Sequence, residues 1–289
     1  MLTTAEILAR VRRIEIKTKG LSNHIFAGEY HSAFKGRGMS FSEVREYAAG
    51  DDVRSIDWNV TARSNATHIK VFEEERELTV MLLVDVSLSS LFGSHGRSKR
   101  EMITEVGAVL SFSAATNNDK VGVIFFSDKI EGFIPPKKGR SHILRIIREL
   151  ITLEPKGQAG TKISVALEYL NNVLKKRTIT FVLSDFISAP YETPLQLAAR
   201  RHDLVGIQVY DRGDRELPKA GLLQVVDAET GARRWIDSND KKVQLEYGRA
   251  FEGMRHYGVQ AFRKAGATLV SMRTEDDYVK MLQGFFKGR

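Results

Sequence analysis

Hydrophobic and polar positions follow two patterns along this chain, and the change comes near Glu77. Beyond that residue, short runs rich in Val, Ile and Leu alternate with longer segments of helical periodicity. The runs predict strands over 78–84, 121–127, 178–184, 204–210 and 267–272. The periodic segments predict helices over 97–116, 139–151, 161–176, 191–202, 241–265 and 275–286. Because strands separated by helices form right-handed crossovers, we expect an α/β fold with a mostly parallel, doubly wound, Rossmann-like sheet.

Two segments depart from this alternation. Ile130 to Ile134 is short and apolar, which favours an antiparallel strand at the sheet edge. Residues 222–236 alternate around a Glu-Thr-Gly turn and predict an inserted β-hairpin. Before Glu77, a helix is expected over 4–19, and glycines and mixed charges then replace the apolar runs. We therefore expect an N-terminal segment, 1–77, packed on a main domain, 78–289.

The first strand of the main domain ends in Asp85-x-Ser87-x-Ser89. A buried parallel strand delivers the residues after it to the carboxyl edge of the sheet, where ligands usually bind. A carboxylate and two hydroxyls presented there are hard oxygen ligands, which suit magnesium, calcium or manganese.

Two later loops add to this set. Gly157 to Lys162 is a glycine-containing loop that places Thr161 near the start of a helix, and the strand over 178–184 is followed by Asp185. In this order, Asp85, Ser87, Ser89, Thr161 and Asp185 resemble the metal-ion-dependent adhesion site of the von Willebrand factor A-like fold. The resemblance implies a bound divalent cation, Mg²⁺ in the first place, with Mn²⁺ and Ca²⁺ as alternatives.

The chemistry of such a site favours binding over catalysis. Ser87, Ser89 and Thr161 would contact the ion as neutral hydroxyls, while Asp85 and Asp185 would act largely through bound waters. An ion held mainly by neutral groups keeps much of its positive charge and an exchangeable coordination position. The resemblance implies that a Glu or Asp carboxylate of a partner protein takes that position.

The segment Gly36–Arg63 contains Gly50-Asp51-Asp52-Val53-Arg54-Ser55-Ile56-Asp57-Trp58 and resembles the bacterial family named domain of unknown function 58. That family couples this segment to a von Willebrand factor A-like domain and is commonly encoded near MoxR-type AAA+ ATPases. The resemblance therefore implies such an ATPase, or its client, as partner. Many members also carry two N-terminal membrane helices, which this chain lacks.

Six residues of this segment are candidates for a shared role. They are expected to form either a salt-bridged network that holds the segment onto the main domain, with Trp58 as an apolar anchor, or a docking patch for a carboxylate or phosphate. The candidates are Arg45, Asp52, Arg54, Asp57, Trp58 and Arg63.

Charge is unevenly distributed. The chain has 44 Lys and Arg against 36 Asp and Glu, a net charge of +8. Residues 97–177 hold 15 basic and 8 acidic residues, whereas residues 1–77 hold 12 of each. This excess favours an acidic partner, anionic lipid or nucleic acid, or is simply a solvated surface. Nucleic acid is disfavoured because the basic residues are not interleaved with aromatic ones.

Specific residues argue against several enzymatic alternatives. A phosphatase of the haloacid dehalogenase type needs Asp-x-Asp, but the second position is Ser87, which cannot donate the proton. The loop before Lys162 has the wrong spacing for a phosphate-binding loop, and the seven histidines show no metal-ligand spacing. A metal-dependent phosphoryl-cleaving enzyme at the same loops remains the alternative.

The sequence also contains signals of cellular location. There is no Cys, no apolar run approaching 18 residues and no signal-peptide pattern at the N-terminus, so a cytoplasmic protein is expected. Taken together, these patterns predict a cytoplasmic, non-enzymatic module that binds protein through a divalent metal ion. A binder of anionic lipid or nucleic acid through residues 97–177 is the third interpretation.

Overall fold

A computed structural model describes residues 6, 9, 11–13, 40–64, 66–73, 78–94, 96–153, 160–227 and 231–288. The chain divides into two compact units, and the smaller one comprises Phe34–Leu78. The larger unit contains Thr79–Arg289 together with Met1–Ala33. The predicted boundary after residue 77 lies one residue from the end of the smaller unit. The predicted segment 1–77 is nevertheless divided between the two units, because Met1–Ala33 belongs to the larger one.

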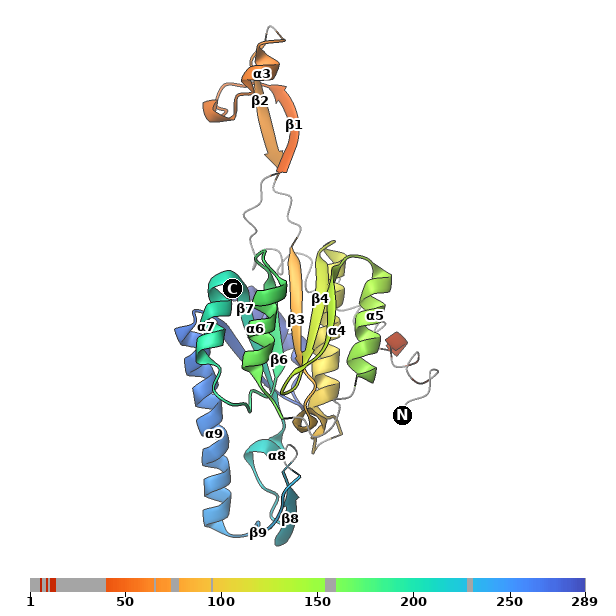
Figure 1. Ribbon diagram of the computed structural model, residues 1–289, viewed down its shortest axis with the longest axis vertical. Coiled ribbons are helices and arrows are strands. Elements are labelled where there is room, and N and C mark those ends of the chain that lie inside the picture. The colour runs from red at the N-terminus through yellow and green to blue at the C-terminus, as the bar shows by residue number, and fades with distance from the viewer. Residues whose placement is uncertain are drawn as a thin grey trace. The chain divides into compact units, whose positions relative to one another are not determined.

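The larger unit is built on one six-stranded sheet (Figure 1). The strand order is β10-β7-β6-β3-β4-β5. Five strands are parallel, and β5 pairs antiparallel with β4 at the edge. The strands are β3 (Thr79–Asp85), β4 (Lys120–Phe126), β5 (Ile130–Lys137), β6 (Ile179–Ser184), β7 (Asp203–Tyr210) and β10 (Thr268–Arg273). This arrangement confirms the predicted Rossmann-like α/β fold, and β3 lies inside the sheet between β6 and β4.

Helices cover both faces of this sheet (Figure 1). One face carries α4 (Lys99–Thr116), α5 (Arg140–Thr152) and α10 (Tyr278–Lys287). The other carries α6 (Ile163–Val173), α7 (Glu192–Arg201) and α9 (Lys241–Lys264). Because both faces are covered, β3 is buried from Val80 to Asp85, which explains its continuous apolar run in the sequence.

The smaller elements lie in the connections. After β3 comes a 3-10 helix, η2 (Leu88–Leu91), and after β7 comes the short helix α8 (Arg212–Arg215). β8 (Leu222–Val226) and β9 (Arg233–Asp237) form the predicted hairpin before α9. α6 begins at Ile163 rather than at Thr161, because the backbone of Lys162 is still extended.

The predicted N-terminal helix falls largely outside the described residues. Within 4–19, the described residues Glu6, Ala9 and Val11 to Arg13 are helical. Among all the helices described, none is both long and apolar enough to cross a membrane.

The smaller unit is an antiparallel pair of strands with helical turns in its long connection. β1 (Ser40–Glu46) pairs with β2 (His68–Glu73), and η1 (Val53–Ser55) and α3 (Trp58–Thr61) lie between them. Ile69 is buried, and its backbone forms a bridge with that of Ile56. The hydrophobic pattern did not predict this hairpin, because the connection is long and contains its own hydrogen-bonded turns.

The close approach of β4 and β5 at Gly122 provides a test of the fold. A methyl group there would lie 2.7 Å from Met81 Sδ and 2.9 Å from the Ile134 carbonyl oxygen. Gly122→Ala should lower the free energy of unfolding by about 1–3 kcal/mol, measured by urea denaturation. Gly132→Ala is the matched control, since its nearest contact would be an ordinary 3.4 Å to Phe125. Equal effects of the two substitutions would contradict this packing.

Candidate functional site

The site begins where two adjacent parallel strands end. Val84 of β3 pairs with Leu183 of β6, so Asp85 lies beside Ser184, and Asp185 follows directly. Both aspartates are buried, with 1% and 3% of their surface exposed. The pairing of β3 with β6 therefore brings two carboxylates together at the carboxyl edge of the sheet.

A chain of hydrogen bonds joins these carboxylates through hydroxyls. Asp85 accepts from the Ser87 backbone N–H at 2.9 Å and from Ser184 Oγ at 2.6 Å. Ser87 Oγ lies 3.0 Å from Ser89 Oγ, and Ser89 Oγ donates to Asp185 Oδ2 at 2.9 Å. Four of the five predicted ligands thus form one continuous cluster, which we call the Asp85–Asp185 cluster.

Thr161, the fifth predicted ligand, reaches this region by another route. Its carbonyl accepts from Ser188 Oγ at 3.0 Å, three residues beyond Asp185. Ser188 Oγ is also 3.2 Å from the Ile163 backbone N–H, which anchors the start of α6. Thr161 is therefore connected to the cluster through the loop after β6.

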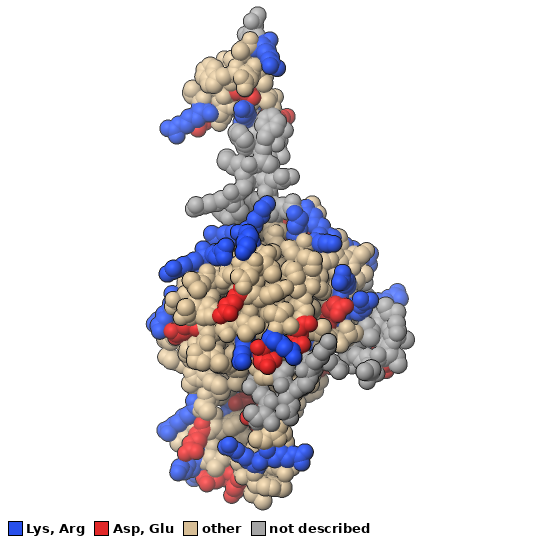
Figure 2. Space-filling view, in the orientation of Figure 1, with Lys and Arg blue, Asp and Glu red and all other residues tan. Residues whose placement is uncertain are grey.

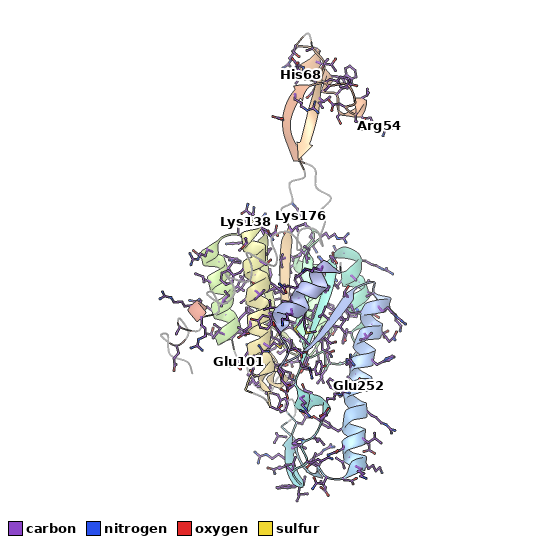
Figure 3. The ribbon with its side chains drawn as sticks, turned by 180° about the vertical axis from the view of Figure 1, so that it is seen from behind. Arg54, His68, Glu101, Lys138, Lys176 and Glu252 are labelled. Atoms are coloured by element: carbon purple, nitrogen blue, oxygen red, sulfur yellow. The ribbon has the colours of Figure 1, made fainter. Side chains whose placement is uncertain are left out.

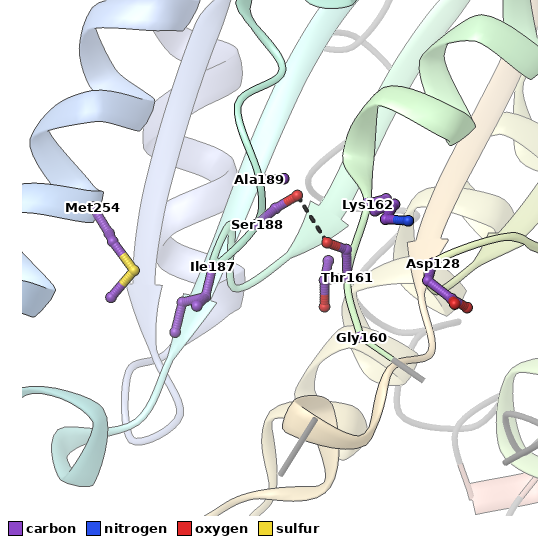
Figure 4. Close-up of a pocket in the computed structure, with 8 residues that line it drawn as sticks. All are labelled: Asp128, Gly160, Thr161, Lys162, Ile187, Ser188, Ala189 and Met254. Atoms are coloured by element: carbon purple, nitrogen blue, oxygen red, sulfur yellow. Dashed lines mark hydrogen bonds between the residues drawn. The ribbon is translucent and has the colours of Figure 1, made fainter. Parts of the chain in front are cut away.

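An open pocket of about 300 Å³ lies beside the cluster (Figure 4). Figure 4 shows Thr161 and Ser188 on facing segments of its wall, joined by the bond just described. The pocket is lined by Thr161 and by residues after Asp185, not by the two carboxylates. Its lining residues are Asp128, Gly160, Thr161, Lys162, Ile187, Ser188, Ala189 and Met254.

The electrostatics of the cluster reflect two buried acids. Burial, and then repulsion from Asp185, raise the pKa of Asp85 from 3.8 to about 6, against the opposing hydrogen bonds of Ser184 and Ser87. A positive charge placed between the carboxylates would relieve this repulsion.

One positive charge is already present, and it was missed by the sequence analysis. Lys99, the first residue of α4, is only 1% exposed, and its Nζ lies 2.9 Å from Asp185 Oδ2. The same Nζ lies 3.2 Å from Asp214 in α8. Burial lowers the pKa of Lys99, but the two carboxylates outweigh burial and raise it overall. Counting Lys99 in the basic surface of residues 97–177 was therefore wrong.

The loop after β6 has an unusual backbone. Phe186 has a φ of +60°, a left-handed conformation uncommon for a residue other than glycine. Its ring packs against Phe262 and Tyr191, and its backbone N–H donates to Ser184 Oγ at 3.0 Å. These contacts compensate for the strain and hold Asp185 in place.

The donor atoms fit a hard divalent cation. Carboxylate and hydroxyl oxygens are the ligands preferred by Mg²⁺, Mn²⁺ and Ca²⁺. In the described part of the chain, no three His, Cys, Asp or Glu side chains form a metal-ligand group. An ion here would therefore depend on the hydroxyls of Ser87 and Ser89 in addition to Asp85 and Asp185.

The six candidates of the smaller unit do not share one network in the described contacts. Arg45 forms a two-pronged salt bridge with Asp51, a residue outside the predicted set, at 2.7 and 2.8 Å. Asp52 caps η1 through the Arg54 backbone N–H. Asp57 caps α3 and lies 3.4 Å from Lys70 Nζ. The acids thus act mainly as local helix caps.

Trp58 is not buried within the smaller unit, since 68% of its surface is exposed there. Its expected role as an apolar anchor on the main domain stays a prediction. The side chains of Arg54 and Arg63 are exposed as well.

This chain is similar to known sequences. Residues 43–257 match the family model described as protein of unknown function DUF58. Uncharacterized protein Rv1480 of Mycobacterium tuberculosis (strain ATCC 25618 / H37Rv) is 30% identical over 287 residues, covering 98% of this chain and 90% of the relative. Uncharacterized protein MAV169 of Mycobacterium avium is 28% identical over 159 residues, covering 54% of this chain and 93% of the relative.

Solved structures also align with this chain. An aerotolerance-related membrane protein from Bacteroides fragilis aligns with a TM-score of 0.50 and 15% identity, over 73% of this chain and 97% of that chain. The SpRpn10 VWA domain aligns with a TM-score of 0.40 and 13% identity, over 71% of this chain and 94% of that chain. The strand order and the first of these likenesses identify the larger unit as von Willebrand factor A-like.

The raised pKa of Asp85 has a consequence for stability. Without metal, the folded protein holds a proton on Asp85 that the unfolded chain releases near pH 3.8, so stability falls as pH rises through about 6. Asp85→Asn should remove this loss and gain about 1–2 kcal/mol relative to wild type between pH 5 and pH 8. Urea unfolding in the presence of a chelator measures this difference in the free energy of unfolding.

The exposed helix cap Asp240 provides the control, since Asp240→Asn is the same substitution at a position outside the cluster. If wild type and Asp85→Asn change in parallel between pH 5 and pH 8, the Asp85 carboxyl is not perturbed.

Proposed function

This chain belongs to the family described as protein of unknown function DUF58, and we propose that it is a non-enzymatic protein-binding module that depends on a divalent cation. The von Willebrand factor A-like fold of the larger unit suggests a protein-interaction module. The proposal adds the metal, the carboxylate of a partner and the absence of catalysis.

The observation that carries the proposal is the continuous Asp85–Asp185 cluster. Two buried carboxylates are linked by the hydroxyls of Ser87 and Ser89, and Ser89 is only half-buried, which leaves an approach from solvent. Because the hydroxyls carry no charge, a divalent ion bound here keeps affinity for one more anionic ligand. A Glu or Asp side chain of a partner protein supplies that ligand.

The surroundings of the cluster favour binding over phosphoryl cleavage. Ser87 stands where an acid-base carboxylate would be required, and its Oγ contacts Ser89. Two described histidines are also poorly placed for proton transfer. His142 contacts the Val121 carbonyl and His202 contacts Thr178, and both lie at the opposite edge of the sheet.

The partner that we propose is a MoxR-type AAA+ ATPase or its client, in the cytoplasm. The family membership supports this choice, because such ATPases are commonly encoded beside members of the family. The ATPase would present an acidic side chain to the metal, and this chain would act as its adaptor.

A second candidate function rests on a separate surface. The amino ends of the parallel strands carry exposed basic side chains, which we call the basic edge: Lys137, Lys138, Arg140, Lys175, Lys176, Arg177 and Arg200. Figure 2 shows Lys and Arg gathered along this edge of the larger unit, and Figure 3 shows Lys138 and Lys176 there. Such a field would attract an anionic surface, in a salt-dependent manner.

Partner capture tests the metal-dependent function. Asp85→Ala and Ser87→Ala should each reduce capture at least tenfold, because both remove groups that hold the ion. Chelation should reproduce the loss in wild type, and added Mg²⁺ or Mn²⁺ should reverse it. Pull-down followed by mass spectrometry, with and without chelator, measures both effects.

The matched control is Ser90→Ala, since the Ser90 hydroxyl lies in the same loop but donates to the Ser87 carbonyl. This variant and Ser87→Ala should each change the free energy of unfolding by about 1 kcal/mol or less.

Salt dependence separates the two candidate functions. An inner-shell carboxylate bond is screened far less than a diffuse basic surface, so capture through the metal should weaken only moderately at high salt. Lys175→Glu with Lys176→Glu should leave metal-dependent capture intact. Capture that survives chelation and Asp85→Ala, but is lost in this double variant and at high salt, would assign binding to the basic edge.

A further inference from the structure

The feature that the proposed function does not use is the buried lysine beside the metal ligands. Lys99 Nζ and Ser89 Oγ both lie 2.9 Å from the same atom, Asp185 Oδ2. The ammonium therefore borders directly on the position that an ion held by Ser89 and Asp185 would occupy. A lysine on the solvated side of a helix would have no such contact.

We propose that Lys99 is a resident cation of the site, which opposes entry of the divalent ion and thereby sets its affinity. This inference rests on the proposed function and deepens it by naming the residue that regulates the metal. Its physical basis is repulsion between the buried ammonium and the divalent ion, which is strong because little solvent separates them.

Asp214 is the second charged residue in this arrangement. It lies on α8 and contacts Lys99 Nζ at 3.2 Å, so Lys99 joins the cluster to α8. Asp214 also accepts from the Asp211 backbone N–H at 2.8 Å, which keeps its carboxylate in place independently of Lys99. Asp214 therefore offsets the charge of Lys99 without itself being a predicted metal ligand.

Asp185 does not need Lys99 to keep its orientation. Its Oδ1 accepts from the Ile187 backbone N–H at 3.1 Å, and its Oδ2 accepts from Ser89. Removing the ammonium should thus leave the carboxylate positioned for the ion. An electrostatic effect of Lys99 on metal affinity can therefore be distinguished from an effect of Lys99 on the orientation of Asp185.

Substitutions of Lys99 and of Asp214 are predicted to change metal affinity in opposite directions. Lys99→Met keeps most of the side-chain volume and removes the repulsion, so the Kd for Mn²⁺ should fall by about tenfold or more. Asp214→Asn keeps the shape and the hydrogen-bonded position but leaves Lys99 less compensated, so the Kd should rise by about threefold. The double variant removes both charges and should bind within about threefold of wild type.

Isothermal titration of the full chain with Mn²⁺ alone measures these constants, and urea unfolding checks that each variant is folded. If Lys99→Met does not fold, the Kd of Asp214→Asn is compared with that of the double variant. The double variant should bind Mn²⁺ more tightly, because it also lacks the ammonium. Tighter binding by Lys99→Met with weaker binding by Asp214→Asn supports the inference. Weaker binding by Lys99→Met would make Lys99 a structural support of Asp185 and overturn it.

The outcome is distinguishable from that of the proposed function. If wild type binds Mn²⁺ and captures its partner only without chelator, but Lys99→Met binds no tighter, the inference alone fails. If wild type binds no Mn²⁺ but Lys99→Met does, the inference stands and the metal-dependent function of the wild type fails. Absence of binding in every variant overturns both.

Discussion

The structure of the site depends on one constraint, which is the parallel pairing of β3 with β6. That pairing places Asp85 and Asp185 at the ends of neighbouring buried strands, where water cannot screen their charges. Two like charges in such a position need compensation from protons, hydroxyls or cations. The contacts around the cluster supply these three kinds of compensation.

Hydroxyl groups provide the first layer. Ser184 and the Ser87 backbone stabilise Asp85, while Ser89 joins Asp185 to Ser87. The raised pKa of Asp85 shows that these hydrogen bonds do not cancel the cost of burial and repulsion. The cluster therefore retains affinity for positive charge, and Lys99 of α4 supplies part of that charge. In this respect the proposed metal ligands and Lys99 form one electrostatic unit.

The two edges of the central sheet have different chemistry. The carboxyl edge concentrates buried acids and hydroxyls, whereas the amino edge carries exposed Lys and Arg side chains from the ends of β5, α6 and α7. A metal-bridged contact is directional and resists salt, but a basic surface is diffuse and sensitive to salt. The length of the strands thus separates the two proposed binding surfaces, which lie at opposite ends of the parallel strands.

Local pattern determined the fold class and most of the candidate site. The continuous apolar run before Asp85 marks a strand buried on both faces, and its end locates the sheet edge without any knowledge of the partner strands. The same reasoning located Asp185, and alternation around a Glu-Thr-Gly turn located the inserted hairpin.

Only the tertiary structure revealed Ser184, Asp214 and Lys99 as members of the site. Lys99 and Asp185 are 86 positions apart, and Arg97-Ser98-Lys99-Arg100 has the composition of a solvated helix start. The physical reason is that periodicity reports which face of an element is apolar, whereas the burial of a single charge depends on which distant groups the fold brings against it.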